Sequence, residues 1–279
     1  MRQRWALSAA FFLMAGAGIR VSGQVQYATG QDVAPVFEGW ERNPDGTYNM
    51  VFGYLNRNYE EEADIPIGGE NTISMGGETY GDRGQPTHFY QRRQRFIFRV
   101  VVPKDWGKDQ RVVWTLTSRG RTNKANGWLQ PEWELSEDVI VENMGGGVAD
   151  PNNKAPALTI SPAQTVGLTE KVTLLASATD DGLPIPRKRA ASNPDRDSQA
   201  RRPAGVQIKW IQYRGPGKVT FDRDASPVVH GEPVSVSSKV SFSAPGTYVI
   251  RAIANDGQLF TTRDVTVTVT PVAPLSGTR

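Results

Sequence analysis

Apolar and polar residues alternate along most of the chain after residue 150. In the run Val172 to Ala178 every second side chain is apolar, and Val206 to Trp210 and Val265 to Val269 repeat this period of two. Such a period places alternate side chains on opposite faces of a strand, and no stretch here has helical periodicity. Further strands are expected at Ala157–Ile160, Lys218–Phe221, Val234–Val236, Lys239–Phe242 and Tyr248–Ala254.

Residues 34–143 show the same alternation. Turn signals at Asn43–Gly46 and Pro103–Gly107 separate the apolar runs, which favours a second β-sandwich. The inward positions of its strands are expected at Tyr48, Met50, Phe52 and Tyr54, at Phe96, Phe98, Val100 and Val102, at Val112, Trp114 and Leu116, and at Val139 and Val141.

The two halves are separated by residues 144–156, which are rich in Gly, Pro and Asn and have few apolar side chains. This composition is typical of an exposed linker. We therefore expect an all-β chain with two β-sandwich domains in tandem, one at 34–143 and one at 157–270.

The first residues predict export. Residues 1–23 combine a basic start, an apolar stretch from Trp5 to Ile19 and a small residue at a cleavage position, as a signal peptide does. The apolar stretch is shorter than the roughly 20 residues of a membrane span, and no second one follows it. We expect a secreted protein, periplasmic or extracellular, with no transmembrane segment after signal removal.

Charge and cysteine content narrow the function further. The chain has 32 Lys and Arg against 29 Asp and Glu, and no cysteine. Arg2, Arg4 and Arg20 would leave with the signal peptide, which makes the charges of the mature chain equal in number. Because nucleic-acid binding needs clustered excess positive charge, we expect no nucleic-acid partner. Without disulfides, stability must come from core packing.

The run Gly246–Ile250 reads as a tyrosine corner of an immunoglobulin-like sandwich. In that pattern a tyrosine two residues before a core position hydrogen-bonds back to the upstream backbone. Tyr248 would be this tyrosine, and Trp210 would be the buried tryptophan of a central strand, between Ile250 and Leu174.

An ordered set of motifs resembles the PKD-type domains of secreted bacterial proteins. The set is Asn153–Pro156, Ala178–Gly182, Trp210 with Gly215–Phe221, Phe242–Tyr248 and Asn255–Gly257. The resemblance covers about residues 153–270 and implies an immunoglobulin-like module that spaces, orients or binds. A long insertion at 185–205 departs from the pattern, and the Gly-Pro-Gly run lies after it. Residues 34–143 resemble an uncharacterised β-domain of secreted bacterial proteins.

The PKD resemblance also implies a calcium site. Some members hold calcium where the linker meets the strand-end loops, which corresponds here to Asn153, Asp180, Asp181 and Asp256. Calcium prefers roughly six to eight oxygen ligands from flexible loops. The same aspartates also suit Asp-Gly turns, in which they accept backbone hydrogen bonds without an ion.

Two surface features have an open interpretation. The insertion at 185–205 has six basic residues from Arg187 to Arg202 against Asp195 and Asp197. It fits either a salt-sensitive contact with an anionic polymer or membrane, or a solvated loop. In the N-terminal half, aromatic side chains beside acids suit stacking on sugar rings, although aromatics on strands are more often core. The candidates for glycan binding are Trp40, Trp106, Trp128 and Trp133.

Catalytic motifs are absent from the sequence. His88 and His230 lie in different halves, there is no cysteine nucleophile, and no Gly-x-Ser-x-Gly or phosphate-binding loop occurs. Glu132 and Glu134 would share one face of a strand and could form a glycosidase pair, but nothing selects them over other acids. We expect a non-catalytic module without a cofactor, calcium apart, that binds an envelope or extracellular protein, or alternatively a polysaccharide.

Overall fold

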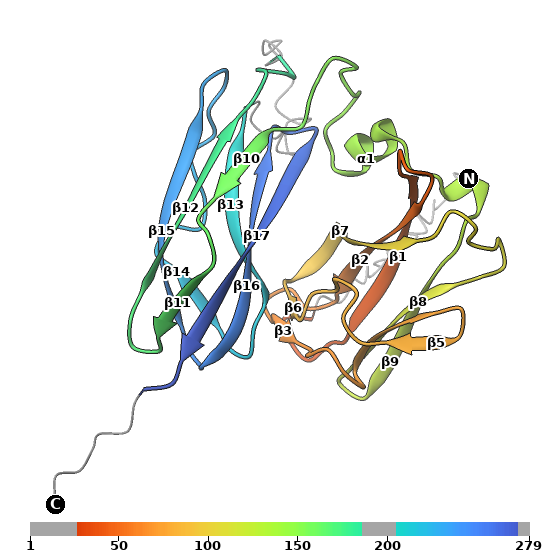
Figure 1. Ribbon diagram of the computed structural model, residues 1–279, viewed down its shortest axis with the longest axis horizontal. Coiled ribbons are helices and arrows are strands. Elements are labelled where there is room, and N and C mark those ends of the chain that lie inside the picture. Colours follow the sequence, from red (N-terminus) through yellow and green to blue (C-terminus); the bar gives the residue numbers. More distant parts are fainter. Residues whose placement is uncertain (1–26, 186–204, 273–279) are drawn as a thin grey trace, which may run out of the picture.

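A computed structural model describes residues 27–185 and 205–272, and β-strands dominate both halves (Figure 1). The predicted signal peptide, residues 1–23, lies outside the described residues. So does the basic part of the predicted insertion, residues 186–204.

The C-terminal half is a sandwich of two four-stranded sheets. In the first sheet the order is β10 (Ala157–Ile160), β12 (Val172–Thr179), β15 (Val234–Phe242) and β14 (Val219–Phe221). In the second the order is β11 (Gln164–Gly167), β17 (Phe260–Thr270), β16 (Gly246–Asn255) and β13 (Gln207–Arg214). The first two strands are therefore edge strands of different sheets: β10 pairs antiparallel with β12, and β11 pairs parallel with β17. The remaining strands follow the order of immunoglobulin sandwiches.

The core of this sandwich confirms the tyrosine corner. The Tyr248 hydroxyl donates to the carbonyl oxygen of Ala244 at 2.8 Å, and Tyr248 is fully buried. Trp210 on β13 is also buried, in one cluster with Leu174 and Ile250. A Cβ on Gly215 would overlap the Tyr248 ring, so close packing against this ring requires the first glycine of the Gly-Pro-Gly run.

The N-terminal half contains a three-stranded and a four-stranded sheet. The first has the order β1 (Val33–Arg42), β2 (Tyr48–Asn56) and β7 (Arg92–Val102). The second has the order β5 (Glu78–Tyr80), β4 (Asn71–Met75), β8 (Val112–Ser118) and β9 (Arg121–Gly127). A short pair, β3 (Ala63–Asp64) and β6 (His88–Phe89), lies beside them.

Aromatic side chains join the two N-terminal sheets. The ring of Trp114 on β8 lies edge-on to Phe98 on β7 at 4.8 Å and to Phe52 on β2 at 6.1 Å between centroids. All three side chains are buried. The sheets therefore face each other across one core, and the expected all-β fold with two sandwiches in tandem is confirmed.

The strand predicted around Val139 and Val141 is wrong. These residues lie in an α-helix, α1 (Glu137–Asn143), which follows a 3-10 turn, η1 (Pro131–Trp133). The Ser136 hydroxyl caps the helix by accepting from the Val139 backbone N–H at 3.4 Å. Acidic residues at the first two helical positions favour the positive end of the helix dipole.

The two strands predicted at 234–236 and 239–242 form one continuous strand, β15. Polar residues between the two apolar runs suggested a break there. Ser238 is nevertheless fully buried, and its hydroxyl donates to the Asp222 carboxylate at 3.3 Å. A satisfied polar group can remain inside a strand, because its hydrogen bond offsets the loss of hydration.

Candidate functional site

The two sandwiches meet where residues 82–90, which we call the docking segment, lie along β13. The Thr87 backbone N–H donates to the Tyr213 carbonyl at 3.2 Å, and the Gly215 N–H donates to the Thr87 hydroxyl at 3.2 Å. β13 is the edge strand of its sheet. Residues 224–229 pair with the first part of this edge. The docking segment covers its last residues, where backbone groups would otherwise be unpaired.

A β-bulge in β13 turns one tyrosine into this junction. The pairing with β16 shifts register between Gln212 and Arg214, next to Tyr213. Tyr213 is 4% exposed, and its hydroxyl donates to the Gly84 carbonyl. Burial raises the pKa of Tyr213 to about 12, although Arg251 and Arg214 oppose the rise. The hydroxyl therefore stays protonated and remains a donor at neutral pH.

Two arginines of the C-terminal sandwich bind groups of the N-terminal sandwich. Arg251 lies over the Tyr213 ring, 3.5 Å from its centroid, and donates to the Ile97 carbonyl at 2.8 Å. Arg214 donates to both carboxylate oxygens of Asp82 at 2.6 and 2.8 Å and to the Gln85 carbonyl at 2.8 Å. Arginine suits this role because its planar group binds several acceptors at once.

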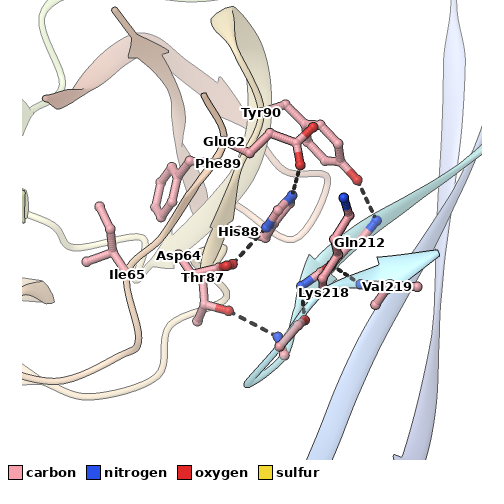
Figure 2. A network of polar contacts seen from close by, with 12 residues as sticks. Glu62, Asp64, Ile65, Thr87, His88, Phe89, Tyr90, Gln212, Lys218 and Val219 are labelled. Carbon is pink, nitrogen blue, oxygen red and sulfur yellow. Dashed lines mark hydrogen bonds and ion pairs between the residues drawn. The ribbon is translucent and has the colours of Figure 1, made fainter. Parts of the chain in front are cut away.

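A buried histidine stiffens the docking segment (Figure 2). The Nδ1 atom of His88 lies 2.7 Å from an Asp64 carboxylate oxygen, and its Nε2 atom lies 3.2 Å from Glu62. Tyr90 packs edge-on against the imidazole at 4.7 Å, and its hydroxyl accepts from the Gln212 backbone N–H at 2.8 Å. The network therefore reaches from β3 to β13.

The charge state of His88 follows from its neighbours. Burial of the ring lowers its pKa, but hydrogen bonds and charge attraction from Asp64 and Glu62 outweigh this and raise the pKa to about 9. At neutral pH the imidazolium donates from both nitrogens. Because neither nitrogen has a free lone pair, the arrangement fits structural support better than general base catalysis.

The structure brings the four predicted calcium residues together. The Asn153 side-chain amide donates to Asp256 at 3.2 Å, and the Lys154 backbone N–H donates to Asp181 at 3.0 Å. Asp180 accepts from the Gly182 N–H at 3.0 Å, as the turn interpretation requires.

Two side-chain oxygens of this cluster, Asn153 Oδ1 and Asp180 Oδ1, are buried without a hydrogen-bond partner. Burial raises the pKa of Asp180, and the nearby charges of Asp256 and Asp181 add to this rise. Burial likewise raises the pKa of Asp256, against backbone hydrogen bonds that lower it. Within residues 27–185 and 205–272, however, no group of three or more His, Cys, Asp or Glu side chains could hold a metal ion. Calcium binding stays a prediction.

The four candidate tryptophans have different environments. Trp40 is 3% exposed, belongs to the core and donates from its indole to the Gln130 carbonyl at 2.7 Å. Trp106 is partly buried against the same core. Trp128 and Trp133 stack with each other at 6.0 Å and with Phe37 at 6.1 and 5.4 Å. Trp128 and Trp133 therefore form the one surface group among the four, and Trp133 is 40% exposed. Trp40, by contrast, is buried and not accessible to a sugar.

Glu132 and Glu134 do not lie on a strand as the glycosidase alternative assumed. Glu132 belongs to η1, and Glu134 follows it and pairs with Arg42 at 2.7 Å.

An open cleft separates the sandwiches beyond the docking segment. It has a volume of about 740 Å³ and lies between Glu41 and Arg99 of the N-terminal sandwich, α1, and the first residues of β17. No sequence pattern predicts this cleft, because it depends on how the two sandwiches are placed. No helix in the described parts of the chain has the length and apolar character of a membrane span.

No protein-family model and no curated protein matches this sequence. Among solved structures the chain is similar to the PKD domain of human KIAA0319, with 14% identity, a TM-score of 0.22, and coverage of 47% of this chain and 96% of that one. It is also similar to the I-band fragment I67–I69 of titin, with 9% identity, a TM-score of 0.26 and coverage of 86% and 65%. A third similar structure is Dpr2 Ig1–Ig2 in complex with DIP-Theta Ig1–Ig3, with 12% identity, a TM-score of 0.25, and coverage of 86% of this chain and 100% of that one. These TM-scores are low, so the immunoglobulin-like fold rests on the strand pairing described above.

Proposed function

We propose that this chain is an exported, non-catalytic interaction module of the cell envelope that binds a protein partner, with a PKD-type C-terminal sandwich. The observation that carries the proposal is the junction of the two sandwiches. Arg214, Arg251 and Tyr213 of one sandwich bind side-chain and backbone groups of the other. A fixed junction presents both sandwiches to a partner as one preformed surface.

The junction supports recognition for an energetic reason. Binding costs free energy when domains or loops must be ordered at the same time. Here the docking segment, the bulge at Tyr213 and the ion pair of His88 are already ordered by contacts within the chain. A flexible spacer would need none of these contacts.

The experiment is cross-linking capture from a native envelope extract with the exported chain as bait, followed by mass spectrometry. The proposal expects a small set of proteins that excess unlabelled bait displaces. Capture of no displaceable protein would refute it. A bait with Tyr213→Ala and Arg251→Ala, which loosens the junction, should lose capture while both sandwiches remain folded by circular dichroism.

Glycan binding is the second candidate, and a specific observation favours it. Trp128 and Trp133 have nearly parallel rings, tilted by 28°, and each stacks with the buried ring of Phe37, at 19° and 8°. The Arg111 guanidinium lies 4.7 Å from the Trp128 ring centroid. Such a surface suits the apolar face of a sugar ring. Affinity electrophoresis in polysaccharide gels should show retention that Trp133→Ala abolishes and that Tyr59→Ala leaves intact. Tyr59 is a matched control because it is also 40% exposed.

Calcium would have a supporting role in this proposal. Asn153 lies at the linker, and Asp180, Asp181 and Asp256 lie in turns near it, so an ion there would tie the linker to the C-terminal sandwich. The unpartnered oxygens of Asn153 and Asp180 fit this expectation. The remaining ligands would have to come from backbone carbonyls and water.

A further inference from the structure

The cleft between the sandwiches lies outside every group of residues assigned above except Asn153. Clefts at domain interfaces are common ligand sites, and ligand pockets measure roughly 300 to 1,000 Å³. The volume of about 740 Å³ is within that range. Its lining includes Arg99 of β7, Ile140 of α1 and Arg263 of β17, so both sandwiches supply walls.

The wall from the N-terminal sandwich is close to neutral. Arg99 donates two hydrogen bonds of 2.8 Å to the Glu41 carboxylate, and Asn49 donates a third at 3.2 Å. This pairing leaves neither charge free for a ligand.

The rest of the lining includes two basic side chains, one from the linker and one from β17. Lys154 and Arg263 line the cleft, both are exposed, and neither forms an ion pair with an acidic side chain among the described residues. The nearby acid on β17, Asp264, is already paired with Arg251 at 2.7 Å. Glu137 on α1 is the one remaining acidic residue of the lining.

Apolar side chains lie between the charged groups. Leu135, Ile140 and Phe260 line the same cleft and are half-buried. A ligand that covers them would gain roughly 25 cal/mol per Å² of apolar surface removed from water. A ligand that also carries carboxylates would pair with Lys154 and Arg263, because Arg99 and Glu41 are already paired with each other.

We propose that this cleft binds a peptide segment of a protein partner that combines acidic with large apolar side chains. The inference rests on the proposed protein-binding function and names the site and the chemistry of the partner. Arg263 would bind a carboxylate through its two forked nitrogens, and Lys154 would act as a second point charge. The apolar side chains of the peptide would contact Leu135, Ile140 and Phe260.

The test selects displayed random 12-residue peptides on the full chain. The proposal expects enriched peptides with Asp or Glu next to Leu, Phe or Trp. An enriched peptide, synthesised with a fluorescent label, should bind the wild type and lose at least tenfold in affinity to Lys154→Glu and to Arg263→Glu. Arg263→Lys should retain part of the affinity, because it keeps the charge and loses the fork. Enrichment without acidic bias, no enrichment, or equal binding by both charge-reversal variants would overturn the proposal.

Lys171→Glu is the matched control. Lys171 is also exposed, on the C-terminal sandwich, but lies at the opposite end of β12 from the linker. It should leave peptide affinity unchanged. Thermal melting of all variants shows whether the fold is intact, since these side chains are on the surface.

The capture experiment separates failure of this inference from failure of the proposed function. If Lys154→Glu and Arg263→Glu baits still capture the wild-type partners, protein binding stands and the assignment of the cleft is overturned. If the wild-type bait captures nothing, the proposed function itself fails.

Discussion

Arg214 and Asp82 form a two-bond ion pair between the sandwiches, with nitrogen to oxygen distances of 2.6 and 2.8 Å. Arg214 adjoins the bulge of β13, and Asp82 begins the docking segment. The arginine is 18% exposed and the aspartate 59%. The pair therefore connects an ordered strand to a loop, and its loss should increase the mobility of the loop before that of the strand.

Arg214→Ala should loosen the docking segment without unfolding either sandwich. Because Asp82 is largely exposed, we expect a cost of about 1 to 2 kcal/mol. Hydrogen exchange should show the amides of Thr87 and Gln212 exchanging roughly tenfold faster, since about 1.4 kcal/mol corresponds to tenfold. Arg223→Ala, at an exposed position of the same sandwich, should leave both amides protected. Unchanged exchange in Arg214→Ala would mean that the pair does not hold the segment.

His88 makes stability dependent on pH. Its pKa is about 9 in the folded chain and about 6.5 when unfolded. The stabilisation is therefore complete below about pH 6.5, falls as the pH rises, and is lost above about pH 9. The shift corresponds to about 3 kcal/mol at most. The difference in unfolding free energy between wild type and His88→Gln should shrink by that order between pH 6 and pH 10.

A difference for His88→Gln that stays constant between pH 6 and pH 10 would contradict the charged state assigned to His88.

Tyr248→Phe tests the tyrosine corner. The ring packing would remain, but the 2.8 Å hydrogen bond to the Ala244 carbonyl would be lost. We expect a loss of about 1 kcal/mol, somewhat more if the carbonyl is left without water. Chemical denaturation measures it, and Tyr59→Phe at an exposed position should change stability by less than half as much.

Calcium should raise the melting temperature of the wild type relative to chelator, and magnesium should do so less. Asp180→Asn should abolish this shift, because it removes one of the carboxylates whose pKa burial and neighbouring charges raise. In chelator the same variant should be at least as stable as wild type, since mutual repulsion with Asp256 and Asp181 is reduced. Identical melting of the wild type with calcium and with chelator would refute the site.

Alternation of side chains was sufficient to predict most of the C-terminal sandwich. The strands around Leu174, Trp210 and Val267 are buried at alternate positions, as the pattern indicated. β11 was missed because it is four residues long with one buried side chain, Val166. Its pairing partner, rather than its own sequence, makes it a strand.

The helix α1 shows where alternation misleads. Val139 and Val141 are two residues apart, which suits a strand, but Ser136 followed by Glu137 and Asp138 is an N-terminal capping signal. Only Val141 is buried. The capping residues were present in the sequence and outweighed the short apolar pattern.

The site was only partly predictable. The residues around Asp256 could be grouped because a family resemblance supplied their loops. The role of Tyr213 could not be predicted, since it depends on a contact between segments more than 100 residues apart, that of Tyr213 with Gly84. The role of His88 depends on its pairing with Asp64 and Glu62, which only the folded loops bring together. The same reason hides the cleft, whose walls come from both sandwiches.

Binding of a protein by the joined sandwiches can be measured as the affinity of one captured, purified partner. Titration calorimetry would compare wild type with Arg263→Glu and Trp133→Ala. We predict at least a tenfold loss of affinity for Arg263→Glu and no change for Trp133→Ala. Full affinity in Arg263→Glu together with loss in Trp133→Ala would contradict this prediction and place recognition on the aromatic surface.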